Sequence, residues 1–334
     1  MNFEFQIMGK HLFDKYILIA PGSDYGNAMW SDIEKLENGI VLENSIKQTN
    51  RIISLLHHIH FSFAINRKVQ LPLQNIWKNM YSLETLQLDL TKQYCVIYTD
   101  VSAARTDCKY LAKKNKDKNI TMILTMVNTM ARRGSLIEKR LPYFSQVFSF
   151  DRKDCERYGF IYHPTNYSMV TMKDIHQITQ DAFFVGVSKG RAHILTSIYE
   201  RLTAGGAKAE FYISGMESGV ERRQGIHYNQ WISYDQVLKN IRKSNCIVEV
   251  MDELQEGVTL RTMEAICYNK KLLTNNQSIK YTPYYETGNI QVFNKVDDID
   301  IDFVKERSEV DYHYSGEFSP IHLLEHINKV VQHE

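Results

Sequence analysis

Two glutamates, Glu256 and Glu264, stand eight residues apart with Arg261 between them. The apolar run Cys246–Met251 before them predicts a buried strand, and apolar residues three or four apart after them predict a helix. A second apolar run, Lys271–Thr274, follows at once. The pair therefore belongs to a strand-to-helix turn, where ligands bind in open α/β sheets. Carboxylates accept hydrogen bonds from sugar hydroxyls and a guanidinium binds phosphate, so the stretch suits a ligand that carries both groups.

A second group of polar residues follows the apolar run 182–186. The turn 187–191 contains Lys189 and Arg191 directly after Gly186, and a helical pattern begins behind it. Amide donors, the helix dipole and two cations would converge at such a turn, which makes it a candidate anion site. The turn lacks the Gly-x-Gly-x-x-Gly spacing of a dinucleotide fingerprint.

A third candidate is Asp24, in the turn-rich loop 21–27 after the predicted strand 15–20. We expect the next helix near residues 29–36. A carboxylate in this loop could take a proton from a hydroxyl. The alternative, that Asp24 serves only the turn or caps the helix, stays open.

The stretch around Glu256 and Glu264 resembles the nucleotide-sugar site of GT-B glycosyltransferases. The resemblance covers roughly residues 182–276 and includes Gly257 after the first glutamate, an Ala-Ile pair and the Lys-x-Leu-Leu-Thr strand. The aromatic or proline residues usual in the middle of that motif are absent, and Arg261 stands there instead. The resemblance implies two Rossmann-like doubly wound α/β domains that face a cleft.

The resemblance also implies roles for single residues. Glu264 would hold the ribose, and Glu256 with Arg261 the donor sugar or phosphates. Lys189 and Arg191 would neutralise the departing diphosphate, so no metal ion or other cofactor is expected. Gly186, which ends the predicted strand 182–186, and Gly257 are further donor-binding candidates, UDP is the expected nucleotide, and Asp24 is the candidate base.

Purely structural interpretations of the same residues compete with these roles. Both glutamates could simply be exposed residues at a helix start, and the Lys-Arg turn could be a solvated basic turn. Two other functions also stay open: a nucleotide- or glycan-binding subunit without activity, and a sugar-nucleotide epimerase of the same architecture. Backbone groups near Trp231–Tyr234 are candidates for holding the base, with Trp231 and Ile232 expected in a short strand.

Composition favours a globular protein without covalent cross-links. The 334 residues carry a net charge of +1, but residues 1–180 hold 23 basic against 17 acidic side chains. Five cysteines without a Cys-x-x-Cys pair indicate reduced thiols, and the cluster His57, His58 and His60 lacks the spacing of a metal motif. No signal peptide or run of eighteen apolar residues is present, which favours a cytoplasmic protein, with the inner face of the membrane as an option.

The sequence divides into a first domain, residues 1–165, a linker, 166–181, a second domain, 182–317, and a last helix, 318–334, which in GT-B folds commonly crosses back to the first domain. Residues 43–66 predict a long amphipathic helix that packs on a core or lies on a membrane. The expected setting is bacterial capsule, O-antigen or exopolysaccharide assembly, with a nucleotide-sugar donor and a glycan or lipid-linked acceptor. No nucleic-acid partner is expected.

Overall fold

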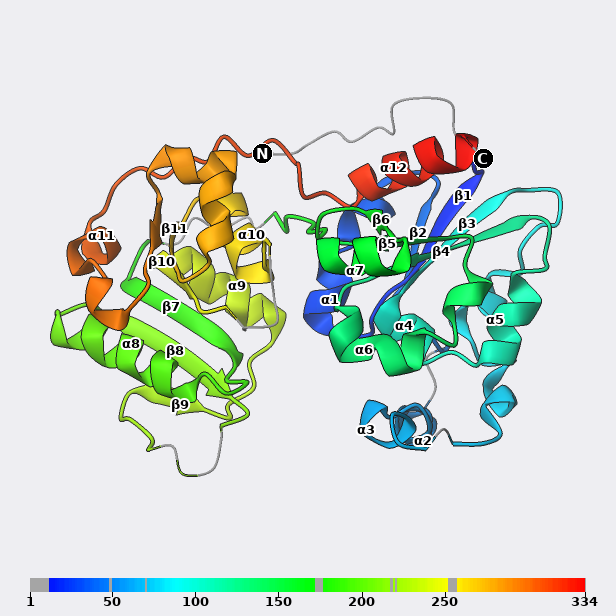
Figure 1. Ribbon diagram of the computed structural model, residues 1–334, viewed down its shortest axis with the longest axis horizontal. Coiled ribbons are helices and arrows are strands. Elements are labelled where there is room, and N and C mark those ends of the chain that lie inside the picture. The colour runs from blue at the N-terminus through cyan, green and yellow to red at the C-terminus, as the bar shows by residue number, and fades with distance from the viewer. Residues whose placement is uncertain are drawn as a thin grey trace. The chain divides into compact units, whose positions relative to one another are not determined.

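The computed structural model describes residues 12–47, 50–69, 71–171, 177–216, 219, 221–251 and 257–333. They belong to two compact units (Figure 1). Unit 1 comprises residues 1–170 and 317–334, and unit 2 comprises residues 171–316.

The described part of unit 1 builds a six-stranded sheet in the order β2-β1-β3-β4-β5-β6, with every neighbouring pair parallel. The strands are β1 (Lys15–Ile19), β2 (Gly39–Leu42), β3 (Tyr94–Thr99), β4 (Ile120–Thr125), β5 (Gln146–Ser149) and β6 (Ile161–Tyr162). The helices are α1 (Asp24–Ala28), α2 (Arg51–His60), α3 (Phe63–Asn66), α4 (Asp100–Ala104), α5 (Cys108–Lys114), α6 (Met130–Ile137), α7 (Arg152–Tyr158) and α12 (Ile321–Gln332), with short 3₁₀ turns that include η1 (Ser31–Lys35) and η2 (Gln74–Trp77).

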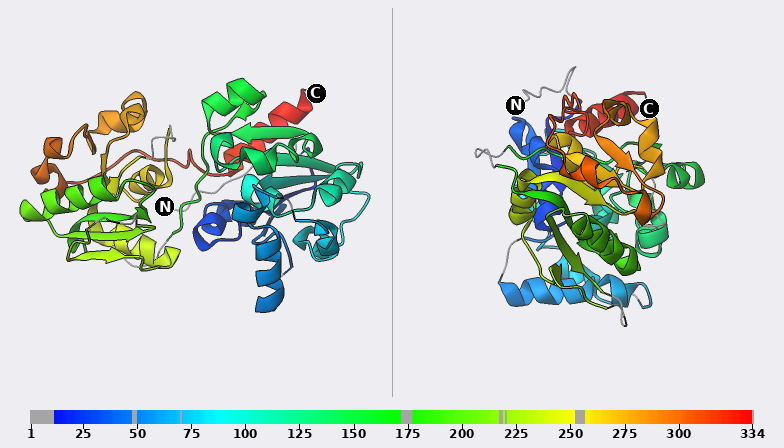
Figure 2. Two further views of the ribbon diagram at one scale, coloured as in Figure 1. Left: turned by 60° about the horizontal axis from the view of Figure 1, so that its bottom comes forward. Right: turned by 90° about the vertical axis from the view of Figure 1, so that its left-hand side faces the viewer.

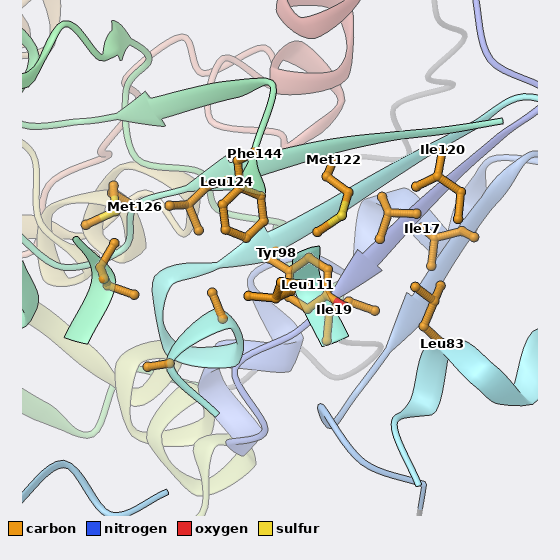
Figure 3. Close-up of a cluster of buried hydrophobic side chains, with 14 of the residues drawn as sticks. Ile17, Ile19, Leu83, Tyr98, Leu111, Ile120, Met122, Leu124, Met126 and Phe144 are labelled. Atoms are coloured by element: carbon orange, nitrogen blue, oxygen red, sulfur yellow. The ribbon is translucent and has the colours of Figure 1, made fainter. Parts of the chain in front are cut away.

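Both faces of this sheet are covered, as a parallel sheet requires. Alternate side chains of β1 point to opposite faces: Ile17 and Ile19 join one apolar cluster with residues of β3, β4 and α4–α6 (Figure 3). Tyr16 points the other way and donates a hydrogen bond to Asn328 of α12, with 2.7 Å between the oxygens. The C-terminal helix therefore packs on the sheet of unit 1.

Unit 2 repeats this architecture. Its described residues build a six-stranded parallel sheet in the order β12-β11-β10-β7-β8-β9. The strands are β7 (Gln180–Val187), β8 (Ala209–Ser214), β9 (Ile226–Tyr228), β10 (Ser244–Glu249), β11 (Lys271–Thr274) and β12 (Ile290–Val292). The helices are α8 (Ala192–Ala204), α9 (Tyr234–Lys243), α10 (Leu260–Cys267) and α11 (Ile301–Lys305).

The strand order reverses direction once in each sheet. In unit 2 the chain passes from β7 outward to β9 and then returns to place β10 on the other side of β7. In unit 1 the same reversal lies between β1 and β3. Ligands of doubly wound sheets bind outside the carboxyl ends of the strands at such a switch point. The two-unit doubly wound architecture predicted from the sequence is confirmed.

Several local predictions were wrong. The first helix begins at Asp24, and the span 29–36 predicted as a helix holds only the 3₁₀ turn η1. The described residues 43–47 are not helical, and α2 begins only at Arg51. Trp231 and Ile232 lie outside any strand; the edge strand is β9, Ile226–Tyr228. Asn50 supplies the start signal of α2, because its side chain accepts a hydrogen bond from the Ile53 amide at 3.0 Å.

Candidate functional site

An arginine joins the two strands at the switch point of unit 2. The guanidinium of Arg191 donates to the carbonyl oxygens of Ser188 at 2.9 Å, Val187 at 2.7 Å and Val250. Val187 ends β7 and Val250 follows β10, so Arg191 fixes the relative position of these two strand ends. The helix α8 begins at the next residue, which brings the positive end of its dipole to the same edge.

The turn that carries Arg191 has an unusual backbone. Lys189 has a φ of +48° and Gly190 a φ of +82°, both in the left-handed region. A lysine rarely adopts this conformation, because it costs about 1–3 kcal/mol of backbone strain. Such strained residues cluster at functional sites. The exposed Lys189 side chain adds a second cation beside Arg191. Gly186 lies inside β7 and not in the turn.

Glu264 is fully buried in α10. One carboxylate oxygen accepts from the Tyr234 hydroxyl at 3.0 Å, and the other pairs with Arg261 one helical turn earlier. Burial raises the pKa of Glu264 to about 7, although Arg261 and the Tyr234 hydrogen bond oppose the rise. The structure thus brings Arg261 and Glu264 together and adds Tyr234, which begins α9.

A carboxylate that sequence reasoning missed holds this edge in place. Glu249 ends β10, is 2% exposed, and accepts hydrogen bonds from the hydroxyls of Thr259, Thr262 at 2.8 Å and Thr274 at 2.6 Å. Thr259 is also the N-cap of α10 and accepts from the amides of Arg261 and Thr262. The signal was present as a glutamate inside an apolar strand followed by three threonines.

Of the two predicted residues Glu256 and Gly257, only Gly257 is among the described residues. Gly257 has a φ of +86°, so a turn at this point needs glycine, and its carbonyl accepts a hydrogen bond from the side-chain Nδ2 of Asn276 at 2.9 Å. Glu256 lies outside the described residues. The candidate donor residues Lys189, Arg191, Arg261 and Glu264 belong to the segments that leave the carboxyl ends of β7 and β10.

The switch point of unit 1 also carries a bridging arginine. Arg105 follows α4, and its guanidinium donates to the Pro21 carbonyl after β1 at 3.1 Å. A cavity of about 510 Å³ opens beside it. The described residues that line this cavity include no carboxylate: Gly22, Asn44, Ser45, Ile46, Lys47, Arg51, Ser54, His57, His58 and Arg105. This positive lining suits an anionic group.

Two histidines of α2, His57 and His60, are held by different hydrogen-bond partners. His57 Nε2 donates to the Arg105 carbonyl at 3.2 Å, and burial lowers the pKa of His57 to about 4, so its ring is neutral at pH 7. His60 instead bonds Pro72 and Trp77. In the described part of the chain, His, Cys, Asp and Glu side chains form no group of three that could hold a metal ion.

Asp24 is exposed in the first turn of α1, where Ser23 occupies the N-cap position. It follows Gly22, which lines the cavity, but Asp24 is not among the lining residues given above. The structure therefore places it near the edge of β1 without showing it to be a base.

No protein-family profile matches the sequence, and no curated protein matches it either. The structure is similar to solved structures. One, from Listeria monocytogenes and assigned as a UDP-N-acetylglucosamine 2-epimerase, has a TM-score of 0.51 at 10% identity, over 97% of this chain and 98% of that chain. The chain has the GT-B fold.

Two further structures show weaker similarity at full length. A T4 phage BGT variant in complex with UDP-glucose has a TM-score of 0.49 at 11% identity, over 94% of this chain and 96% of that chain. The spinosyn forosaminyltransferase SpnP has a TM-score of 0.41 at 9% identity, over 96% of this chain and 100% of that chain. At these identities the comparisons establish the fold alone.

Proposed function

We propose that this GT-B protein is a glycosyltransferase that moves a sugar from a nucleotide-diphosphate sugar, with UDP as the nucleotide, to an acceptor hydroxyl. The observation that carries the proposal is the group at the switch point of unit 2. Arg191 and Lys189 supply positive charge at the start of α8, and the half-buried Arg261 pairs with the buried Glu264 on the helix that follows β10. Cations after β7 and a carboxylate after the neighbouring strand β10 match the two ends of a nucleoside diphosphate.

The residues have distinct roles in this proposal. Lys189 binds the diphosphate, while Arg191, held by three carbonyls, shapes the turn and adds its charge. Arg261 turns from Glu264 to the phosphates, which frees one Glu264 oxygen to accept from a ribose hydroxyl. As the bond from the sugar to the diphosphate breaks, its electron pair goes to the diphosphate, whose negative charge these cations stabilise.

The acceptor belongs to unit 1 in this proposal. Its hydroxyl oxygen forms the new bond to the sugar carbon, and Asp24 takes its proton, with Glu256 as the carboxylate on the donor side. The cationic cavity beside Gly22 and Arg105 would hold an anionic group of the acceptor, such as the phosphate of a lipid-linked glycan. The setting we propose is cell-surface polysaccharide assembly, and the transfer needs no metal ion.

Nucleotide binding tests the donor site directly. We expect UDP to bind the full-length protein in isothermal titration calorimetry, and Lys189→Ala to weaken binding at least fivefold without changing the thermal midpoint. Glu264→Ala should weaken it at least tenfold. The control is Lys208→Ala, an exposed lysine at the amino end of β8, on the opposite edge of the sheet.

The competing functions give different results. Absence of binding for every nucleoside diphosphate in a thermal-shift panel would refute the donor site. A nucleotide sugar that is converted to its epimer without an acceptor would identify an epimerase. Binding without turnover of any nucleotide sugar, with or without acceptor, would indicate a binding subunit.

A further inference from the structure

Helix α2 presents three different faces. Its inner face, with Ile53 and the buried His57, packs in an apolar cluster with Phe61 and Trp77. A second face, with Arg51, Ser54 and His58, lines the cationic cavity. The third face carries four large aliphatic side chains at i, i+3, i+4 and i+7 that stay in solvent: Ile52 at 69% exposed, Leu55 at 58%, Leu56 at 53% and Ile59 at 45%.

The exposed aliphatic side chains continue beyond the helix. Ile65, Val69, Leu73 and Ile76 are also exposed, so this segment, which we call the α2–η2 segment (residues 51–77), holds eight of the fifteen exposed large apolar side chains of the described chain. Leu73, at 71% exposed, has a φ of +62°, a left-handed conformation that is rare for leucine. An apolar surface of this extent usually marks an interaction site.

Internal hydrogen bonds hold the α2–η2 segment together. The side chain of Asn66 donates to the His60 carbonyl at 2.9 Å and accepts from the Leu71 amide at 3.1 Å. The Trp77 indole donates to His60 at 2.9 Å. In the left view of Figure 2, α2 projects from the rest of unit 1. The aliphatic side chains are therefore displayed by a folded, projecting element.

The charges around this surface have one sign. Between Glu43 and Glu84 the sequence contains no acidic residue, whereas it contains five basic ones: Lys47, Arg51, Arg67, Lys68 and Lys78. All five are exposed. A second copy of the same surface would bring like charges together, which opposes self-association. An anionic lipid surface complements both the aliphatic side chains and the basic residues.

We propose that the α2–η2 segment docks unit 1 on an anionic lipid bilayer. The aliphatic face of α2 inserts at the boundary between headgroups and acyl chains, and the surrounding basic residues contact the lipid phosphates. The cavity-lining face of the same helix then lies at the level of the headgroups. No helix of the described residues is long and apolar enough to cross a membrane, and the contact proposed here is peripheral. It does not depend on the proposed transferase activity.

Co-sedimentation of the full-length protein with vesicles tests this docking. We expect at least tenfold stronger partitioning onto phosphatidylcholine vesicles with about a third phosphatidylglycerol than onto pure phosphatidylcholine, and weaker partitioning at high salt. Leu55→Ser/Leu56→Ser should lower partitioning at least tenfold. Both side chains are exposed, so circular dichroism should stay unchanged. The matched control, Leu90→Ser/Tyr281→Ser, removes two other exposed apolar side chains and should bind as wild type.

The basic residues need a separate comparison. Arg67→Glu/Lys68→Glu should abolish the preference for anionic vesicles, because each basic residue near the surface contributes about fivefold to partitioning. Lys116→Glu/Lys118→Glu changes the net charge equally elsewhere on unit 1 and should retain most of the preference.

Two results would overturn the proposal. One is wild-type protein that ignores vesicles of both compositions or binds them equally. The other is a wild-type dimer in sedimentation velocity that Leu55→Ser/Leu56→Ser dissociates, without any vesicle binding, because the surface would then be a contact between copies.

Discussion

Glu264 shows how a candidate ligand-binding residue can also be part of a buried hydrogen-bond network. The sequence identified it as a candidate ligand for ribose, but spacing alone does not reveal that its carboxylate is fully buried against Arg261 and Tyr234. The sequence shows Glu249 as a glutamate in an apolar run followed by three threonines, but it does not show that these threonines become its partners when the chain folds. Contacts between residues distant in sequence decide which carboxylates are buried.

The raised pKa of Glu264 predicts a pH-dependent stability. Its pKa is about 7 in the folded protein against an ordinary 4.5, so between these values the unfolded chain loses the proton while the folded protein keeps it. The free energy of unfolding of the wild type should therefore fall as pH rises from about 4.5 to 7, relative to Glu264→Gln, by on the order of 3 kcal/mol. Urea unfolding of both proteins across this range measures it.

Glu309, which is exposed, provides the control. The free energy of unfolding of Glu309→Gln should follow that of the wild type across the same pH range. Parallel curves for Glu264→Gln and wild type would contradict the assigned burial. UDP affinity should rise over the same pH range if an ionised Glu264 accepts from the ribose.

At the scale of elements, the sequence predicted the strands that form the sheet centres and missed weaker ones. The strands β1 and β10 contain predicted apolar runs and are almost entirely buried, which gives a strong local signal. The edge strands β2 and β12 are short and only partly buried, which leaves a weaker local signal. The 43–66 pattern overestimated α2, because Asn50 caps the helix and α2 itself covers only Arg51–His60.

The N-cap of α10 gives a test at this scale. Thr259→Val removes the oxygen that accepts from two α10 amides and the hydroxyl that donates to Glu249. Losing a cap and leaving a buried carboxylate short of one partner should cost about 2–3 kcal/mol in the free energy of unfolding. Chemical denaturation measures it.

Thr203→Val, in the last turn of α8, is the matched control. Its exposed hydroxyl bonds only carbonyls of its own helix, so the change should cost less than about 0.5 kcal/mol. Equal losses for the two threonines would show that the Glu249 network does not stabilise the turn.

At the scale of the whole molecule, the chain builds the same doubly wound sheet twice, with an arginine bridging the strands at each switch point. The family resemblance carried by residues 182–276 implied this architecture from the sequence. The chemistry of the two switch points differs. Unit 2 pairs Arg261 with the buried Glu264 on the helix that follows β10, whereas unit 1 has a cationic cavity lined by one face of α2, whose outer face carries exposed aliphatic side chains.

Because each unit has its own core, we expect calorimetry to resolve two unfolding transitions. Leu324 of α12 is 0% exposed in unit 1. Leu324→Ala should therefore reduce the free energy of unfolding of one transition by about 2–5 kcal/mol and lower its midpoint temperature. Lys329→Ala, at an exposed position of the same helix, should leave it unchanged. UDP should raise the midpoint temperature of the other transition only, because the proposed donor site lies entirely in unit 2. If UDP instead raised the transition that Leu324→Ala lowers, the donor would bind the first sheet and the assignment of the two switch points would have to be exchanged.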